Sequence, residues 1–145
     1  MELTYQFTTR CPAQKALVLA GNFDHLQAWD NTVTTVNRLS GTEASIGSQW
    51  NIELQFARRR AHMTYEIVNH EPGARLVAIG KNSAIHTCDT LSVVPLATGC
   101  RFTYQITLNG QGWRAWLNPL WYLLFRPSAN RAARALQQWL DTIPH

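Results

Sequence analysis

The chain has 145 residues, of which 46% are hydrophobic and 15% charged, and its formal net charge is +4. This length and composition are typical of one globular domain and exclude a disordered or fibrous chain. The positive charge favours acidic partners, but the sequence has no zinc-finger, RRM or KH signature, so nucleic-acid binding is not expected.

The first part of the chain predicts one strand followed by two short helices. Residues 3–8 alternate apolar and polar side chains, which is typical of a strand. Residues 13–29 have helical spacing that Gly21 and Asn22 interrupt, and Pro12 stands where a helix commonly begins. We therefore expect two short helices directly after the first strand.

The middle of the chain has an apolar period of two, which predicts an antiparallel meander. Turn residues separate the segments, and short connections join neighbouring strands as hairpins. The expected strands are residues 31–39, 48–57, 61–70, 74–80, 84–96 and 100–108.

A single long helix is expected to end the chain. Its apolar residues recur at spacings of three and four, namely Leu120, Leu124, Ala132, Leu136, Trp139 and Leu140. Asn118 and Pro119 are typical of a helix start, and Pro127 predicts a kink or a restart of the helix near that residue.

Aromatic residues are concentrated just before and within this helix, in GWRAWLNPLWYLLF (112–125). The run is shorter than the roughly 20 residues that span a bilayer, and it contains Arg114, Asn118 and Pro119, which argues against a spanning helix. Three interpretations remain open for Trp113, Trp116, Trp121 and Phe125: the wall of an apolar pocket, an ordinary core, or an interfacial helix on a membrane.

Alternation along the strands predicts which side chains face inward, against the long helix. The inward set is Trp50, Ile52, Leu54, Phe56, Met63, Tyr65, Ile67, Ile85, Thr87, Asp89, Leu91, Val93, Phe102, Tyr104, Ile106 and Leu108. His62 and His70 are expected to face outward, and His86 and Cys88 to lie opposite Asp89.

Asp89 is the candidate catalytic residue, because an inward carboxylate can act as a general base or accept a hydrogen bond from a ligand. A paired or capped structural carboxylate is the alternative. Thr87, Tyr65, Tyr104 and Asn118 are the other polar candidates.

Several classes of site have no sequence signature. The cysteines Cys11, Cys88 and Cys100 are odd in number without CxxC spacing, so neither a disulfide framework nor a zinc site is predicted, and a reducing cytoplasm is favoured. Residues 1–14 lack the pattern of a signal peptide. No P-loop, GxGxxG, GxSxG or metal-binding spacing occurs, so we expect neither a cofactor nor a metal.

The order of elements and four sequence segments resemble the helix-grip proteins of the SRPBCC superfamily. That superfamily includes START domains, birch-pollen-allergen relatives and polyketide cyclase/dehydrase-like proteins. The resembling segments are DHLQAWDNTVTTV (24–36), YEIVNHEPGARLV (65–77), TLSVVPLATGCRFTYQITL (90–108) and ARALQQWLDT (133–142). The resemblance implies one α+β domain over residues 1–145, with a curved antiparallel sheet of about seven strands wrapped round the long C-terminal helix.

The resemblance also implies a cavity between sheet and helix for a small or medium hydrophobic ligand, such as a lipid, an isoprenoid or an aromatic polyketide-like molecule. The residues expected to line it are Trp50, Leu54, Tyr65, Ile67, Thr87, Asp89, Leu91, Tyr104, Trp113, Trp116, Leu117, Leu120, Trp121 and Leu124.

Binding without turnover is the expected function, by a cytoplasmic monomer or homodimer. One alternative is a cyclase- or dehydratase-like enzyme in which Asp89 or a tyrosine moves a proton. The other is an adaptor for a protein or an anionic membrane surface, which would use Arg58, Arg59 and Arg60 and the tryptophan-rich helix.

Overall fold

The structure is a computed structural model that describes residues 2–56, 58–110, 112 and 118–144. Seven antiparallel strands form one curved sheet in the order β1-β7-β6-β5-β4-β3-β2. The strands are β1 (Glu2–Thr9), β2 (Val33–Ser40), β3 (Gln49–Phe56), β4 (Arg59–Glu71), β5 (Arg75–Lys81), β6 (Ile85–Pro95) and β7 (Cys100–Gly110).

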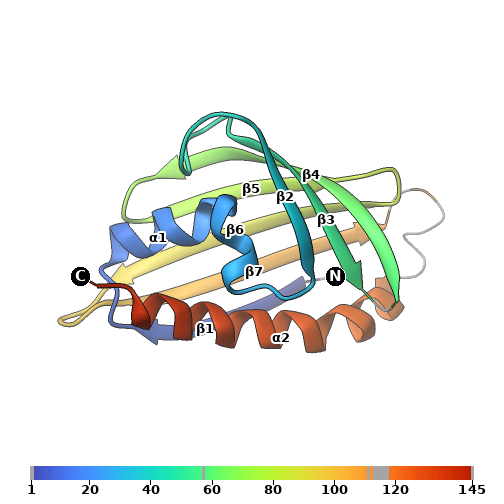
Figure 1. Cartoon of the computed structure of the whole chain (residues 1–145). Helices are drawn as coiled ribbons and strands as arrows, with labels where there is room; N and C mark the ends of the chain where they lie inside the picture. Colours follow the sequence, from blue (N-terminus) through green and yellow to red (C-terminus); the bar gives the residue numbers. More distant parts are fainter. Residues whose placement is uncertain (1, 57, 111, 113–117, 145) are drawn as a thin grey trace.

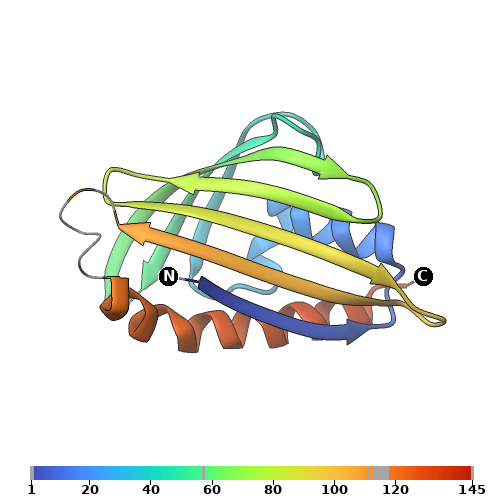
Figure 2. The same ribbon diagram turned by 180° about the vertical axis from the view of Figure 1, so that it is seen from behind.

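Three helices lie on the same, concave face of this sheet (Figures 1 and 2). They are α1 (Ala13–Gly21), the 3-10 helix η1 (Phe23–Ala28) and the long α2 (Asn118–Thr142). The helix α2 runs along β1, and α1 with η1 carries the chain from β1 across to β2 at the other edge. The predicted α+β architecture is therefore confirmed.

The turn between β6 and β7 requires glycine at position 99. Its φ of +80° is a conformation that residues with a side chain rarely adopt. A Cβ atom there would also lie 1.9 Å from the carbonyl oxygen of Thr9 at the end of β1. Because residue 99 is glycine, this turn can pack closely against the end of β1.

The end of α2 is fastened to the end of β1 by hydrogen bonds. Asp141 accepts from the Thr9 hydroxyl at 2.6 Å and from the backbone N–H of Arg10 at 3.0 Å. Gln137 donates to the Thr8 carbonyl oxygen at 2.9 Å. These bonds fix the C-terminal half of the helix along the sheet edge.

The helix α2 continues through Pro127 as one helix, so it does not restart there. The alternative prediction, a kink near this residue, stays a prediction. Leu136 and Leu140 in its second half are fully buried against the sheet. Burial of this apolar stripe supports the helix beyond the position where proline removes a backbone donor. No helix in the described part of the chain is long and apolar enough to cross a membrane.

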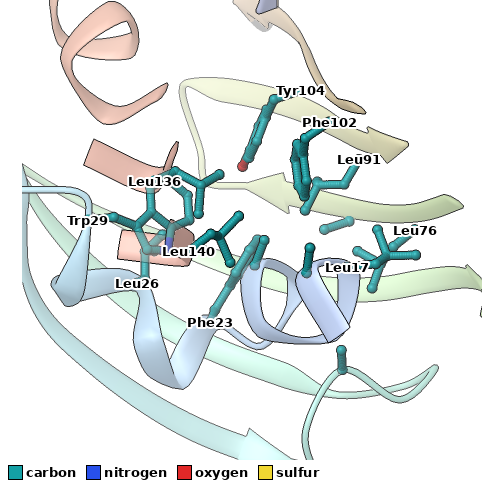
Figure 3. Close-up of a cluster of buried hydrophobic side chains, with 14 of the residues drawn as sticks. Leu17, Phe23, Leu26, Trp29, Leu76, Leu91, Phe102, Tyr104, Leu136 and Leu140 are labelled. Atoms are coloured by element: carbon teal, nitrogen blue, oxygen red, sulfur yellow. The ribbon is translucent and has the colours of Figure 1, made fainter. Parts of the chain in front are cut away.

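The core lies between the concave face and the helices (Figure 3). Its largest fully buried side chains include Leu17 and Phe23 from the short helices, Leu76, Leu91 and Phe102 from the sheet, and Leu136 and Leu140 from α2. The predicted inward face is confirmed for the described members, which alternate with more exposed residues along β6 and β7.

One prediction about this face is wrong. The register between β4 and β5 shifts between Ile67 and Asn69, so that Val68 is an extra residue and is 43% exposed. Beyond this bulge His70 pairs with Leu76, a fully buried residue of the concave face. His70 therefore faces inward rather than outward, because a one-residue bulge exchanges the two faces of the strand.

Candidate functional site

Asp89 lies near the middle of the concave face, where apolar residues surround it. It stands on β6 between the inward residues Thr87 and Leu91, and its cross-strand neighbours are Ala78 on β5 and Ile106 on β7. Its exposed fraction is only 6%. The prediction that this carboxylate faces inward is confirmed.

Only one oxygen of the Asp89 carboxylate has a hydrogen-bond partner among the described residues. Tyr104 donates its hydroxyl to Oδ2 at 2.8 Å, across the β6–β7 pair. The other oxygen, Oδ1, is buried and without a partner in the described part of the chain. Buried polar atoms are nearly always paired, so this oxygen marks a site with unused hydrogen-bonding capacity.

Burial raises the pKa of Asp89 to about 7, since an apolar environment disfavours the charged form. The hydrogen bond from Tyr104 acts in the opposite direction, and the negative charge of Asp30 raises the pKa further. The pKa of Tyr104 is raised well above its ordinary value, by burial and then by the charge of Asp89. Tyr104 thus remains a neutral donor while Asp89 exchanges a proton near neutral pH.

The side chains of Tyr65 and Thr87 both pack against Gly80, next to Asp89. A Cβ atom at Gly80 would lie 2.5 Å from Tyr65 Cε1 and 2.6 Å from Thr87 Oγ1, so only glycine leaves room for both side chains. Phe23 from η1 packs edge-on against the Tyr65 ring, with centroids 5.3 Å apart. The pKa of Tyr65 is raised by burial and then by the charge of Asp89, which keeps its hydroxyl protonated.

Part of the concave face remains accessible. Leu54, Tyr65 and Ile106 all point to the inner side of the sheet, yet each is only half-buried. Ile106 is the cross-strand neighbour of Asp89. The apolar surface beside the carboxylate is therefore not fully covered by the side chains that the structure describes.

Trp50 has a different role from the accessible residues. It is fully buried, and its indole Nε1 donates to Asp24 Oδ1 at 2.9 Å. The Arg38 guanidinium lies 4.7 Å from the centre of the Trp50 ring and donates Nη2 to Asp24 Oδ2 at 2.9 Å. The same nitrogen contacts Asn22 Oδ1 and the Glu43 carbonyl oxygen, each at 2.9 Å.

This network joins η1 to β2 and β3. Burial alone would raise the pKa of Asp24, but the hydrogen bonds from Arg38 and Trp50, together with the Arg38 charge, lower it. Arg38 was not predicted as a partner of Asp24, because the two residues lie 14 positions apart with no periodic relation. Trp50 is thus fixed by a hydrogen bond to Asp24 and by the Arg38 guanidinium over its ring.

Two further residues were missed near the carboxylate. Trp29 is 6% exposed and packs edge-on against Tyr104, with ring centroids 6.1 Å apart. Asp30 accepts from the Thr32 hydroxyl at 2.7 Å and from the Thr32 backbone N–H at 3.0 Å, while burial raises its pKa. Both lie in an irregular segment after η1, where no periodicity indicates an inward position.

The remaining predicted site residues fall into two groups. Ile67 and Leu91 are fully buried in the core, adjoining the accessible surface. Trp113, Trp116 and Leu117 lie outside the described residues, and so do the side chains of Asn118, Leu120, Trp121 and Leu124. Arg58 is exposed in the β3–β4 turn, and Arg60 is exposed at the start of β4. No cluster of three metal-ligating side chains occurs in the described ranges.

Comparison with known proteins identifies the family. Residues 1–140 match the family model described as polyketide cyclase / dehydrase and lipid transport. The chain belongs to this family. No curated protein sequence matches it.

Solved structures of the same fold are similar over nearly the whole chain. A START superfamily protein from Mycobacterium smegmatis has a TM-score of 0.79 at 10% identity, and each chain is 99% covered. A protein from Thermus thermophilus has a TM-score of 0.79 at 12% identity, with 97% of each chain covered. An aromatase/cyclase from Streptomyces has a TM-score of 0.78 at 9% identity, covering 97% of this chain and 93% of that one. The predicted START-like helix-grip fold is confirmed.

Proposed function

We propose that the protein binds a hydrophobic ligand between the concave face of the sheet and the helices, with Asp89 and Tyr104 meeting a polar group of that ligand. The observation that carries the proposal is the Asp89 carboxylate, which is buried in apolar surroundings and has one oxygen without a partner among the described residues. Ligand sites are typically apolar with a few convergent polar groups and perturbed pKa values.

The energetics favour a ligand with a hydroxyl group. A buried polar atom without a partner costs about 1–3 kcal/mol, so a structural carboxylate would normally be paired completely. A hydroxyl both donates and accepts, and it can therefore bond to Asp89 in either protonation state. The half-buried side chains of Leu54 and Ile106 would contact the apolar part of the ligand.

A fluorescence titration with N-phenylnaphthylamine tests the proposal, because this dye emits strongly only in apolar surroundings. Saturable binding to the folded protein is expected, and it should be absent after denaturation. Failure of the dye and of a wider panel of apolar ligands to bind, or to raise Tm, would contradict the proposal.

A matched pair of variants on β7 localises the dye. Ile106→Trp adds bulk on the concave face beside Asp89, whereas Thr107→Trp adds it on the opposite face of the same strand. We expect the first variant to weaken dye binding by about fivefold or more, since overpacking costs about 1–3 kcal/mol. The second should leave the affinity unchanged. Equal effects of the two variants would place the dye elsewhere.

A second candidate function is supported by the Asp89 pKa of about 7, which is suited to proton transfer near neutral pH. In a dehydratase-like reaction the Asp89 carboxylate would take up the proton next to a substrate carbonyl, the C–O bond of the β-hydroxyl would break, and the same proton would pass to the departing hydroxyl to form water. Dehydration of a β-hydroxy ketone to the conjugated enone, followed by absorbance, tests this. The wild-type protein should accelerate the reaction and Asp89→Asn should not. Equal rates with the two proteins would contradict this second function.

A further inference from the structure

Trp29 holds a second buried polar atom without a partner. Its Nε1 is buried and makes no hydrogen bond to any residue that the structure describes, although the side chain is only 6% exposed. Trp50 differs from Trp29 in this respect, because its Nε1 donates a hydrogen bond to Asp24. The carboxylate nearest in sequence to Trp29 is that of Asp30, whose Oδ1 accepts from Thr32 instead.

The two residues that carry these atoms, Trp29 and Asp89, both contact Tyr104. Tyr104 contacts the Trp29 ring edge-on, at 6.1 Å between centroids and an interplanar angle of 68°. The hydroxyl of the same tyrosine binds Asp89. Figure 3 shows Trp29 and Tyr104 in one cluster with Leu136 and Leu140, and the oxygen of Tyr104 is directed toward this cluster.

The two atoms have opposite hydrogen-bonding character. An indole N–H donates and cannot accept, so it needs an acceptor such as a carbonyl or ether oxygen. Asp89 Oδ1 accepts when the carboxylate is ionised, so a hydroxyl group suits it. Neither of the two requirements is met by the described residues around them.

We infer that the ligand of this site is a bifunctional apolar molecule, with a hydroxyl group held by Asp89 and a separate carbonyl-type oxygen held by the Trp29 indole N–H. This inference rests on the proposed function and defines the ligand class. A ligand that lacks either oxygen leaves one buried polar atom unpaired. Sites with such atoms discriminate strongly against analogues that lack the matching group.

Displacement of N-phenylnaphthylamine by four ligands with one shared skeleton tests the inference. The ligands are ethylnaphthalene, naphthol, acetylnaphthalene and hydroxyacetylnaphthalene, substituted at the same ring positions. Hydroxyacetylnaphthalene should bind about tenfold or more tighter than ethylnaphthalene, and each single group should contribute about threefold or more.

Trp29→Phe assigns the carbonyl preference to the indole N–H. This variant keeps an aromatic ring and removes the donor. The preference for acetylnaphthalene over ethylnaphthalene should disappear, while the preference for naphthol over ethylnaphthalene remains. Trp139→Phe is the matched control, because Trp139 is a half-buried tryptophan on α2 whose ring lies 5.6 Å from that of His25. It should keep both preferences.

The indole proton of Trp29 gives a second measurement in the wild-type protein, which does not depend on the folding of a variant. Its NMR resonance should move downfield with acetylnaphthalene and stay in place with ethylnaphthalene, as a new hydrogen bond requires.

Each contrary outcome overturns a defined statement. Dye binding with equal affinities for all four ligands would overturn the inference and leave the proposed function standing. A carbonyl preference that survives in Trp29→Phe, or an unmoved indole resonance, would overturn the role of Trp29. Absence of any dye or ligand binding would overturn the proposed function, and the inference with it.

Discussion

Asp24 and Asp89 are two carboxylates of one small domain whose surroundings shift their pKa values in opposite directions. Asp24 receives hydrogen bonds from Arg38 and Trp50, and its pKa is lowered. Asp89 receives one from Tyr104 in apolar surroundings, and its pKa is raised to about 7. Donors satisfy the carboxylate of Asp24, which joins elements of the fold, whereas the described residues satisfy only one oxygen of Asp89.

Under the proposed function, this difference separates a carboxylate that joins elements of the fold from one that meets a ligand. Complete pairing stabilises the attachment of η1 to the sheet. Incomplete pairing lowers stability at neutral pH, and such a defect persists where a ligand completes the bonding.

The largest expected effect is that of Asp89→Asn on the pH dependence of stability. The pKa of Asp89 is higher in the folded protein than its ordinary value of 3.8, so the folded state binds more protons between these two values. The free energy of unfolding of the wild type should therefore fall as pH rises from about 4 to about 7, by up to about 1.4 kcal/mol per pH unit from this group.

Urea denaturation across this pH range measures the effect. Asp89→Asn cannot ionise, so its stability relative to wild type should increase with pH and level off above about pH 7. A constant difference between the two proteins across this range would show that Asp89 has an ordinary pKa.

Trp50→Phe should be the next most damaging change, at about 3 kcal/mol. It removes a charge-assisted hydrogen bond to Asp24 and leaves unfilled volume in a fully buried site. Trp139→Phe, at a half-buried position, should cost less. Thermal denaturation compares the two variants, and equal losses would contradict the structural role given to Trp50.

Tyr104→Phe should destabilise the protein by about 2 kcal/mol above pH 7 and by less at acid pH. It leaves both oxygens of Asp89 without a donor among the described residues, which disfavours the ionised form. The pKa of Asp89 should therefore rise above its wild-type value. An unchanged pKa in this variant would mean that the hydroxyl does not bind the carboxylate in solution.

Asp24→Asn should have the smallest effect, about 1 kcal/mol or less, because the Asp24 side chain is 44% exposed and solvent screens its ion pair with Arg38. The pH dependence of this effect has the opposite sign to that of the Asp89 contribution. The lowered pKa of Asp24 stabilises the folded protein at pH values above the ordinary pKa of 3.8. This stabilisation is lost as the pH falls. The difference from wild type should vanish in acid, and denaturation near pH 3 compared with pH 7 measures it.

Regular alternation explains why much of the site was predictable from the sequence. Period two along β6 and β7 placed Asp89, Thr87 and Tyr104 on one face, and hairpin pairing brought Asp89 and Tyr104 together. Periodicity and turn residues predicted the order of elements, which the structure confirms. That order and the four resembling segments predicted the family, which the family model confirms.

Irregular positions explain what was missed. Trp29 and Asp30 follow η1, where no repeating pattern indicates which side chains turn inward. The bulge at Val68 reverses the face of His70, and no residue near it indicates the extra position. The long helix accommodates Pro127 through tertiary packing, which local propensity does not include. The proposed roles of Trp113, Trp116 and Trp121 stay predictions.

The pKa of Asp89, measured by carbon-13 NMR of its carboxyl group as a function of pH, tests the central claim most directly. A buried, half-satisfied carboxylate facing an apolar interior predicts a midpoint near pH 7 in the ligand-free protein. A midpoint near the ordinary value of 3.8 would show that the carboxylate is solvated or fully paired, and would contradict the account of this site.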